Sequence, residues 1–168
     1  MLTKSIFFKN FRLKKKNKQI KKDLNLLLKE NNTVLKSLSP SYKNSYKKKT
    51  ILKFKKYSQI RVIGMGGSIL GTETIYDFLR SRIKKNFYFV NNLQPKINFE
   101  KKKFVNLIVS KSGNTLETIS NSNVIIKKND KNIFITENKK SYLHLLAEKL
   151  KAEIVHHNNF IGGRYSVL

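Results

Sequence analysis

Two turns rich in glycine and hydroxyl residues carry the side chains of this sequence that are best suited to chemistry. Residues 64–68 read Gly-Met-Gly-Gly-Ser, and residues 110–118 read Ser-Lys-Ser-Gly-Asn-Thr-Leu-Glu-Thr. Glycines let the backbone approach a ligand closely. Hydroxyls, an ammonium group and the amides at a helix N-terminus all donate hydrogen bonds to anions. Together the two turns favour a site for a phosphate monoester.

Each turn also has a purely structural interpretation. Ser68 is placed to cap the helix predicted after the first turn, which needs no ligand. In the second turn, Asn114 and Glu117 fit a capping box, so we expect a helix to begin near Thr115. Five small polar residues and Lys111 are more than a cap requires, which favours phosphate binding there.

Two nucleotide-binding interpretations fail on the sequence. A dinucleotide site needs an acidic residue near the end of the second strand, but that strand ends Val-Asn-Asn at residues 90–92. A Walker A loop needs Gly-Lys followed by Ser or Thr after four variable residues, and the first turn lacks that spacing.

The elements that must position these turns are short strands alternating with helices. Continuous apolar runs at residues 60–63, 87–90, 104–109, 133–135 and 154–155 are separated by segments of helix length. This alternation predicts βαβ units, right-handed crossovers and a mostly parallel sheet, with ligands bound beyond the carboxyl ends of the strands.

Residues 1–57 form a very basic segment, with 18 Lys or Arg against 2 Asp or Glu. Apolar spacing predicts a helix over residues 18–31, and the Ser-Pro-Ser sequence at 39–41 predicts a break. We therefore divide the 168 residues into a basic helical N-terminal segment, 1–57, and an α/β domain, 58–168.

The formal net charge of +26 first raises the question of nucleic-acid binding. Only 5 of the 36 basic residues are arginine, whereas nucleic-acid readers favour arginine for its bidentate contacts. Because Lys, Asn and Ile all have AT-rich codons, genome composition accounts for much of the charge. We expect no specific nucleic-acid partner.

Composition excludes several further classes. The absence of cysteine excludes disulfides and Cys-based zinc sites, and no histidine pair has metal partners at suitable spacing. No apolar run approaches the ~18 residues of a membrane-spanning helix, and the first residues lack the pattern of a secretory signal. We expect a cytoplasmic protein without a membrane partner.

Three motifs carry a family resemblance. The Gly-Gly-Ser at 66–68 and the Ser-Lys-Ser…Thr-Leu-Glu-Thr at 110–118 resemble the sugar isomerase (SIS) domain family. The Gly-Gly-Arg-Tyr-Ser at 162–166 is similar to a signature of the glucose-6-phosphate isomerase family within it. The resemblance covers residues 58–168.

The resemblance implies a flavodoxin-like three-layer α/β/α sandwich with a five-stranded parallel sheet. It implies aldose–ketose isomerisation of glucose 6-phosphate and fructose 6-phosphate, in glycolysis and gluconeogenesis, by a homodimer that needs no cofactor. Arg164 would stabilise the enediolate as the catalytic residue, as a fixed guanidinium beside an oxyanion can. The implied phosphosugar-binding residues are Gly67, Ser68, Ser110, Lys111, Ser112 and Thr115.

The family places a second SIS domain, with the glutamate base, after the Gly-Gly-Arg-Tyr-Ser element. This sequence ends at Leu168, so we expect the N-terminal half of such an enzyme, without the base. Two alternatives stay open. One is a non-catalytic phosphosugar-binding regulator that places its basic segment on DNA, and the other is an SIS isomerase acting on amino sugars or heptoses.

Overall fold

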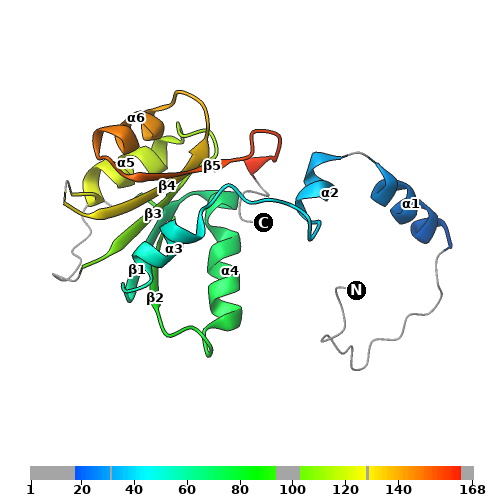
Figure 1. The fold of residues 1–168 in the computed structure, drawn as a ribbon, viewed down its shortest axis with the longest axis horizontal. Coiled ribbons are helices and arrows are strands. Elements are labelled where there is room, and N and C mark those ends of the chain that lie inside the picture. The colour runs from blue at the N-terminus through cyan, green and yellow to red at the C-terminus, as the bar shows by residue number, and fades with distance from the viewer. Residues whose placement is uncertain (1–17, 31, 94–102, 128, 164–168) are drawn as a thin grey trace.

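A computed structural model describes residues 18–30, 32–93, 103–127 and 129–163. Short helices precede a domain in which strands and helices alternate (Figure 1). In chain order the elements are α1 (Lys18–Lys29), α2 (Thr33–Ser37), α3 (Lys48–Phe54), β1 (Gln59–Gly64), η1 (Gly66–Ser68), α4 (Leu70–Leu79), β2 (Asn86–Val90), β3 (Val105–Val109), α5 (Leu116–Ile125), β4 (Lys131–Glu137), α6 (Tyr142–Lys149) and β5 (Glu153–His157).

The five strands form one sheet in the order β2-β1-β3-β4-β5, and every neighbouring pair is parallel. All five predicted apolar runs are strands, so the predicted α/β fold with a five-stranded parallel sheet is confirmed. The continuous apolar sequences suit this sheet because helices cover both of its faces. The order change between β1 and β3 makes their carboxyl ends neighbours, which is where open α/β sheets bind ligands.

Alternation along the strands divides the core between the two faces of the sheet. On one face, Ile63, Ile108 and the fully buried Phe134 pack with Leu143 and Ala147 of α6, and Ile125 of α5 joins them. On the other face, Val62 and Val109 pack with Ile69 at the start of α4. The sheet is therefore the middle of three layers, with α5 and α6 on one side and α4 on the other (Figure 1).

The basic N-terminal segment contains the predicted helix, observed as α1, and two short helices that the periodicity did not indicate. Its second half contacts the end strand β5. Lys53 Nζ lies 2.7 Å from Glu153 Oε1, and the Ser45 hydroxyl donates to the carbonyl oxygen of His156. The division proposed after residue 57 falls between α3 and β1.

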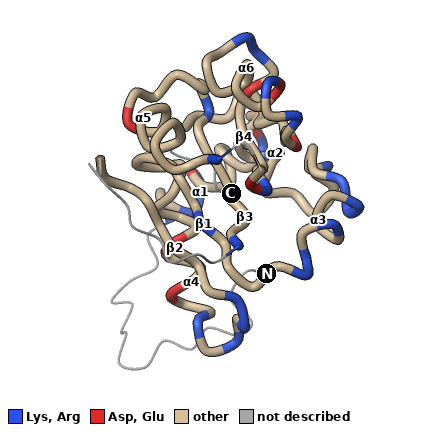
Figure 2. The backbone as a smooth tube through the Cα atoms, turned by 90° about the vertical axis from the view of Figure 1, so that its left-hand side faces the viewer, with Lys and Arg blue, Asp and Glu red and all other residues tan. Residues whose placement is uncertain are grey.

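Basic residues lie on most parts of the tube in Figure 2, from α3 to α4 and the loops around α6. Four of the basic residues, Lys18, Lys21, Lys22 and Lys29, line one surface hollow on α1. Within the described ranges, no helix is both long and apolar enough to cross a membrane.

Among the described residues, one basic side chain is buried. Arg61 is 4% exposed, its Nη1 donates to Asn106 Oδ1 at 3.1 Å, and its guanidinium stacks over Phe104. Asn106 Nδ2 donates in turn to Asn132 Oδ1 and Asp130 Oδ2. Burial lowers the pKa of Arg61 to about 10, and Asp130 opposes that shift. This network lies on the amino-terminal half of the sheet and is structural.

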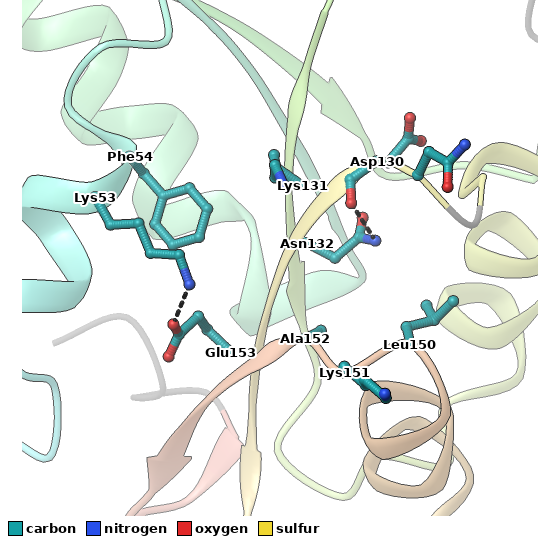
Figure 3. Close-up of a pocket in the computed structure, with 10 residues that line it drawn as sticks. Lys53, Phe54, Asp130, Lys131, Asn132, Leu150, Lys151, Ala152 and Glu153 are labelled. Atoms are coloured by element: carbon teal, nitrogen blue, oxygen red, sulfur yellow. Dashed lines mark hydrogen bonds and ion pairs between the residues drawn. The ribbon is translucent and has the colours of Figure 1, made fainter.

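A hollow of about 380 Å³ lies at the same amino-terminal end, between α3 and the first residues of β4 and β5 (Figure 3). The Lys53–Glu153 ion pair crosses beside it. Neither of the two turns singled out in the sequence contributes to this hollow.

Candidate functional site

The two predicted turns leave the sheet side by side. Gly64 and Val109 are register partners at the ends of β1 and β3, so the segments that follow them start as neighbours. A Cβ on Gly64 would lie 3.0 Å from the carbonyl oxygen of Val109. This close approach explains a glycine at the end of β1. We call the region beyond these strand ends the carboxyl edge.

The first turn contains an extra 3₁₀ turn, η1, before α4. Gly66 has a φ of +54°, a left-handed conformation that suits glycine. The predicted cap at Ser68 is wrong, because Ile69 is the N-cap of α4 and makes no side-chain capping hydrogen bond. Ser68 belongs to η1, where it is buried, and Gly67 precedes it.

The second turn brings two predicted hydroxyl residues together. Ser110, 2% exposed, directly follows β3, and its Oγ shares a hydrogen bond of 3.1 Å with Thr115 Oγ1. Ser112 lies between them and accepts a 3.3 Å hydrogen bond from the Asn114 amide. The hydroxyls of Ser110 and Thr115 therefore meet next to the first residue of α5.

The predicted start of the helix near Thr115 is confirmed, but the predicted capping box is wrong. Thr115 is the N-cap of α5, and its side chain makes no capping hydrogen bond. Asn114 Oδ1 instead accepts from the Tyr142 amide, at 2.9 Å, in the first turn of α6. Because no side chain caps α5 in the described structure, its N-terminal amides can serve an anion.

Gly113 holds the second turn against α6. Its φ is +66°, and its carbonyl oxygen accepts from the Leu143 amide at 3.0 Å. Ser141 caps α6 by accepting from the His144 amide at 3.3 Å, and a Cβ on Gly113 would lie 2.1 Å from Ser141 Oγ. We call residues 110–115 the hydroxyl turn. The glycine therefore allows the hydroxyl turn and the capped start of α6 to occupy neighbouring positions.

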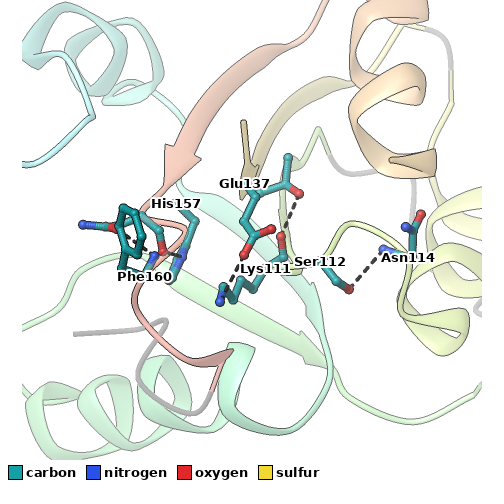
Figure 4. A network of polar contacts seen from close by, with 8 residues as sticks. Lys111, Ser112, Asn114, Glu137, His157 and Phe160 are labelled. Carbon is teal, nitrogen blue, oxygen red and sulfur yellow. Dashed lines mark hydrogen bonds and ion pairs between the residues drawn. The ribbon is translucent and has the colours of Figure 1, made fainter. Parts of the chain in front are cut away.

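The Lys111 side chain is directed to Glu137, the last residue of β4. Its Nζ lies 3.1 Å from Glu137 Oε1, and the two side chains are 24% and 15% exposed (Figure 4). Ser110 bonds Thr115 while Lys111 bonds Glu137, so these two neighbours serve different parts of the carboxyl edge. The carbonyl oxygen of Lys111 also accepts from the Glu137 amide and the Thr136 hydroxyl.

His157 is the third titratable group in this part of the edge. It pairs in register with Glu137, and its Nδ1 lies 2.9 Å from the carbonyl oxygen of Asn158. Burial is the main cause that lowers the pKa of His157 below 6.5, and the charge of Lys111 adds to it. The Asn158 carbonyl and Glu137 act in the opposite direction.

Glu137 is the residue that sequence reasoning missed at this edge. It is the last residue of the fourth apolar strand. All carboxyl ends of a parallel sheet meet at one edge, so a polar residue that ends any of the strands is a candidate for the site, and this signal could have found Glu137. The predicted Arg164 lies outside the described residues. Within the described ranges, no three His, Asp or Glu side chains are grouped to bind a metal.

The sequence matches a known protein family. The sequence model of the family described as "PGI: Phosphoglucose isomerase" matches residues 11–168. The chain is 40% identical over 124 residues to a glucose-6-phosphate isomerase of Methanocaldococcus jannaschii, covering 66% of this chain and 30% of that protein. It is 36% identical over 134 residues to the glucose-6-phosphate isomerase of Borreliella afzelii, covering 67% of this chain and 25% of that protein. The chain thus spans about a quarter to a third of the length of these relatives.

Two solved structures share the fold. A hypothetical protein from Thermus thermophilus superimposes with a TM-score of 0.59 at 22% identity, over 68% of this chain and 31% of that one. The Vibrio vulnificus NanR protein complexed with ManNAc-6P gives a TM-score of 0.50 at 20% identity, over 70% of this chain and 46% of that one.

Proposed function

This chain belongs to the phosphoglucose isomerase family, and from that premise we propose that its carboxyl edge binds the phosphate group of glucose 6-phosphate and fructose 6-phosphate. We propose further that the chain is part of an enzyme that interconverts these two sugars. Glucose 6-phosphate comes from the names of the relatives, and fructose 6-phosphate is the ketose that the family resemblance implies. The binding position comes from the geometry of the two turns.

The observation that carries the proposal is the pair of hydroxyls beside an uncapped helix start. Ser110 and Thr115 lie 3.1 Å apart through their side-chain oxygens, and α5 begins directly after Thr115. A phosphate oxygen can accept from both hydroxyls and from the first amides of α5. Across the edge, Gly67 and Ser68 of η1 lie in the neighbouring turn. Ser112 belongs to the second turn, between Ser110 and Thr115 in the sequence.

Aldose–ketose isomerisation moves a proton between C1 and C2 of the open-chain sugar through an enediolate. In our proposal the hydroxyl turn holds the phosphate end, which fixes where C1 and C2 lie. Lys111 supplies a positive charge at the same edge, and Arg164 stabilises the enediolate oxygen by electrostatic preorganisation, as the resemblance implies. Our proposal names no described residue as the proton-transferring base. We propose in addition that the enzyme is a homodimer and is located in the cytoplasm.

Titration calorimetry with fructose 6-phosphate tests the binding position. Replacing Thr115 with Val keeps the shape of the side chain and removes one donor to a charged group, which we expect to weaken binding by about tenfold or more. The matched control is Thr74→Val, because Thr74 is exposed on α4 and donates to its own helix at Leu70. Equal affinities for Thr115→Val and the parent chain would contradict the proposed site.

A second measurement tests the isomerase part separately. Isomerisation through an enediolate exchanges a sugar carbon-bound proton with solvent, so an enzyme that contains this chain together with the base should label C1 or C2 of fructose 6-phosphate in deuterium oxide. We expect Thr115→Val in that enzyme to reduce the labelling rate together with the affinity. Tight binding without labelling by that enzyme would limit the proposal to a phosphosugar-binding role.

A further inference from the structure

The pairing of Lys111 with Glu137 is not explained by phosphate binding. Lys111 belongs to the hydroxyl turn, and its ammonium group could bind a phosphate. Its Nζ nevertheless lies 3.1 Å from the carboxylate oxygen Oε1 of Glu137. Both side chains are mostly buried, so water screens this ion pair less than it screens a surface pair. A carboxylate at this position repels the dianion that the hydroxyl turn attracts.

The pair is held in place through the backbone as well. The Glu137 amide donates to the Lys111 carbonyl oxygen at 3.0 Å, and the Thr136 hydroxyl donates to the same oxygen at 3.2 Å. Figure 4 shows the Lys111 side chain directed to Glu137, while Ser112 and Asn114 lie on the other side of the loop. The structure thus separates a phosphate end, built from hydroxyls and amides, from a charged pair at the end of β4.

Resting on the proposed function, we propose that Glu137 is a selectivity residue that makes the site favour a hydroxyl-bearing phosphate ester over free inorganic phosphate. Inorganic phosphate has the same terminal group as the sugar ester, so discrimination must come from groups beyond the hydroxyl turn. Glu137 compensates the charge of Lys111, which reduces the attraction of that lysine for a free dianion. The same carboxylate accepts hydrogen bonds from sugar hydroxyls, which inorganic phosphate cannot place there.

The flexible stem of Lys111 explains why compensation matters. A lysine ammonium is a point charge on four rotatable carbons, so an unpaired Lys111 can swing toward any bound anion. Paired with Glu137, it must break or share that contact first. A sugar phosphate can satisfy both partners, because hydroxyls donate to Glu137 and accept from Lys111. Selectivity then follows from the pair and not from either residue alone.

The test compares the affinities of inorganic phosphate and fructose 6-phosphate by calorimetry, at a pH where both are mainly dianions. Glu137→Gln should tighten inorganic phosphate by about three- to tenfold, since Lys111 loses the carboxylate that compensates its charge in a mostly buried site. Fructose 6-phosphate should bind no tighter than before, so the ratio of the two affinities falls. Thermal unfolding of each variant confirms that it is folded.

Glu153→Gln is the matched control. Glu153 also pairs with a lysine, at 2.7 Å, and the substitution changes the net charge equally, but it lies at the amino-terminal end of β5. We expect it to leave the ratio unchanged. In a chain that carries Lys111→Met, Glu137→Gln should have a much smaller effect on inorganic phosphate, because the lysine through which it acts is gone.

The outcomes separate this inference from the proposed function. If the parent chain binds fructose 6-phosphate but Glu137→Gln leaves the ratio unchanged, or Glu153→Gln lowers it equally, only the inference on Glu137 is overturned. An equal loss of affinity for both ligands in Glu137→Gln would show a merely structural role and also overturn it. Failure of the parent chain to bind either ligand would overturn the proposed function and this inference together.

Discussion

Gly113 offers the sharpest test of how the hydroxyl turn is built. Replacing it with Ala introduces a Cβ that would lie 2.1 Å from Ser141 Oγ, 2.8 Å from Ser141 Cβ and 2.9 Å from Thr136 Oγ1. The φ of +66° is also a conformation that costs an L-residue about 1–2 kcal/mol. Overpacking of a filled site adds about 1–3 kcal/mol. We therefore expect Gly113→Ala to lower the free energy of unfolding by about 2–5 kcal/mol.

Gly66→Ala separates the two contributions. Gly66 has a similar φ of +54°, but a Cβ there would meet nothing within 4 Å. This variant carries the conformational cost alone, about 1–2 kcal/mol. The difference between the two variants therefore measures the steric conflict with Ser141 and Thr136. It depends on the tertiary contact between the turn and the start of α6.

Urea denaturation followed by circular dichroism measures both effects. With a slope of roughly 2 kcal/mol per M, Gly113→Ala should move the midpoint down by about 1–2.5 M and Gly66→Ala by about 0.5–1 M. Adding Ser141→Gly to Gly113→Ala removes two of the three close contacts, and a glycine N-cap costs only a few tenths of a kcal/mol. The double variant should therefore recover part of the lost stability. Equal midpoints for Gly113→Ala and Gly66→Ala would refute the packing argument.

Three further outcomes are expected. Asn114→Ala should lower the free energy of unfolding by about 1 kcal/mol, because the Tyr142 amide loses its acceptor, and a urea titration that shows no change would contradict that role. Phe134→Ala empties a fully buried position in the central sheet and should cost about 3–5 kcal/mol by the same measurement, whereas a cost below about 1 kcal/mol would mean that the site is not packed as described. The pKa of His157 is lowered in the folded chain, so the unfolded chain binds the proton more readily, and stability from this group falls as the pH drops through 6.5 toward the lowered value. His157→Asn should therefore reduce the loss of stability between pH 7 and pH 5, and an unchanged pH profile would remove His157 from that account.

The sequence was sufficient for the sheet and for the neighbouring position of the two turns at one of its edges. Apolar runs without alternation required strands buried on both faces, and the helix-length segments between them required parallel pairing. The glycine and hydroxyl turns after the first and third runs then had to lie at a common edge. Hydroxyl pairing of Ser110 with Thr115 agrees with that expectation, because both residues belong to one turn and are only five positions apart.

The contacts that sequence reasoning missed all join segments distant along the chain. The sequence around Asn114 fits a local capping box, but its side chain accepts a hydrogen bond from the distant Tyr142 amide instead. Only the docking of α6 brings that amide within reach. Lys111 similarly suits a phosphate by its type, but it lies beside Glu137, 26 positions later, because β3 and β4 are neighbours. Local patterns determine which groups a turn can offer. Tertiary packing decides which of these groups another part of the protein already occupies, since a hydrogen bond or ion pair forms only where the fold brings its two partners within reach.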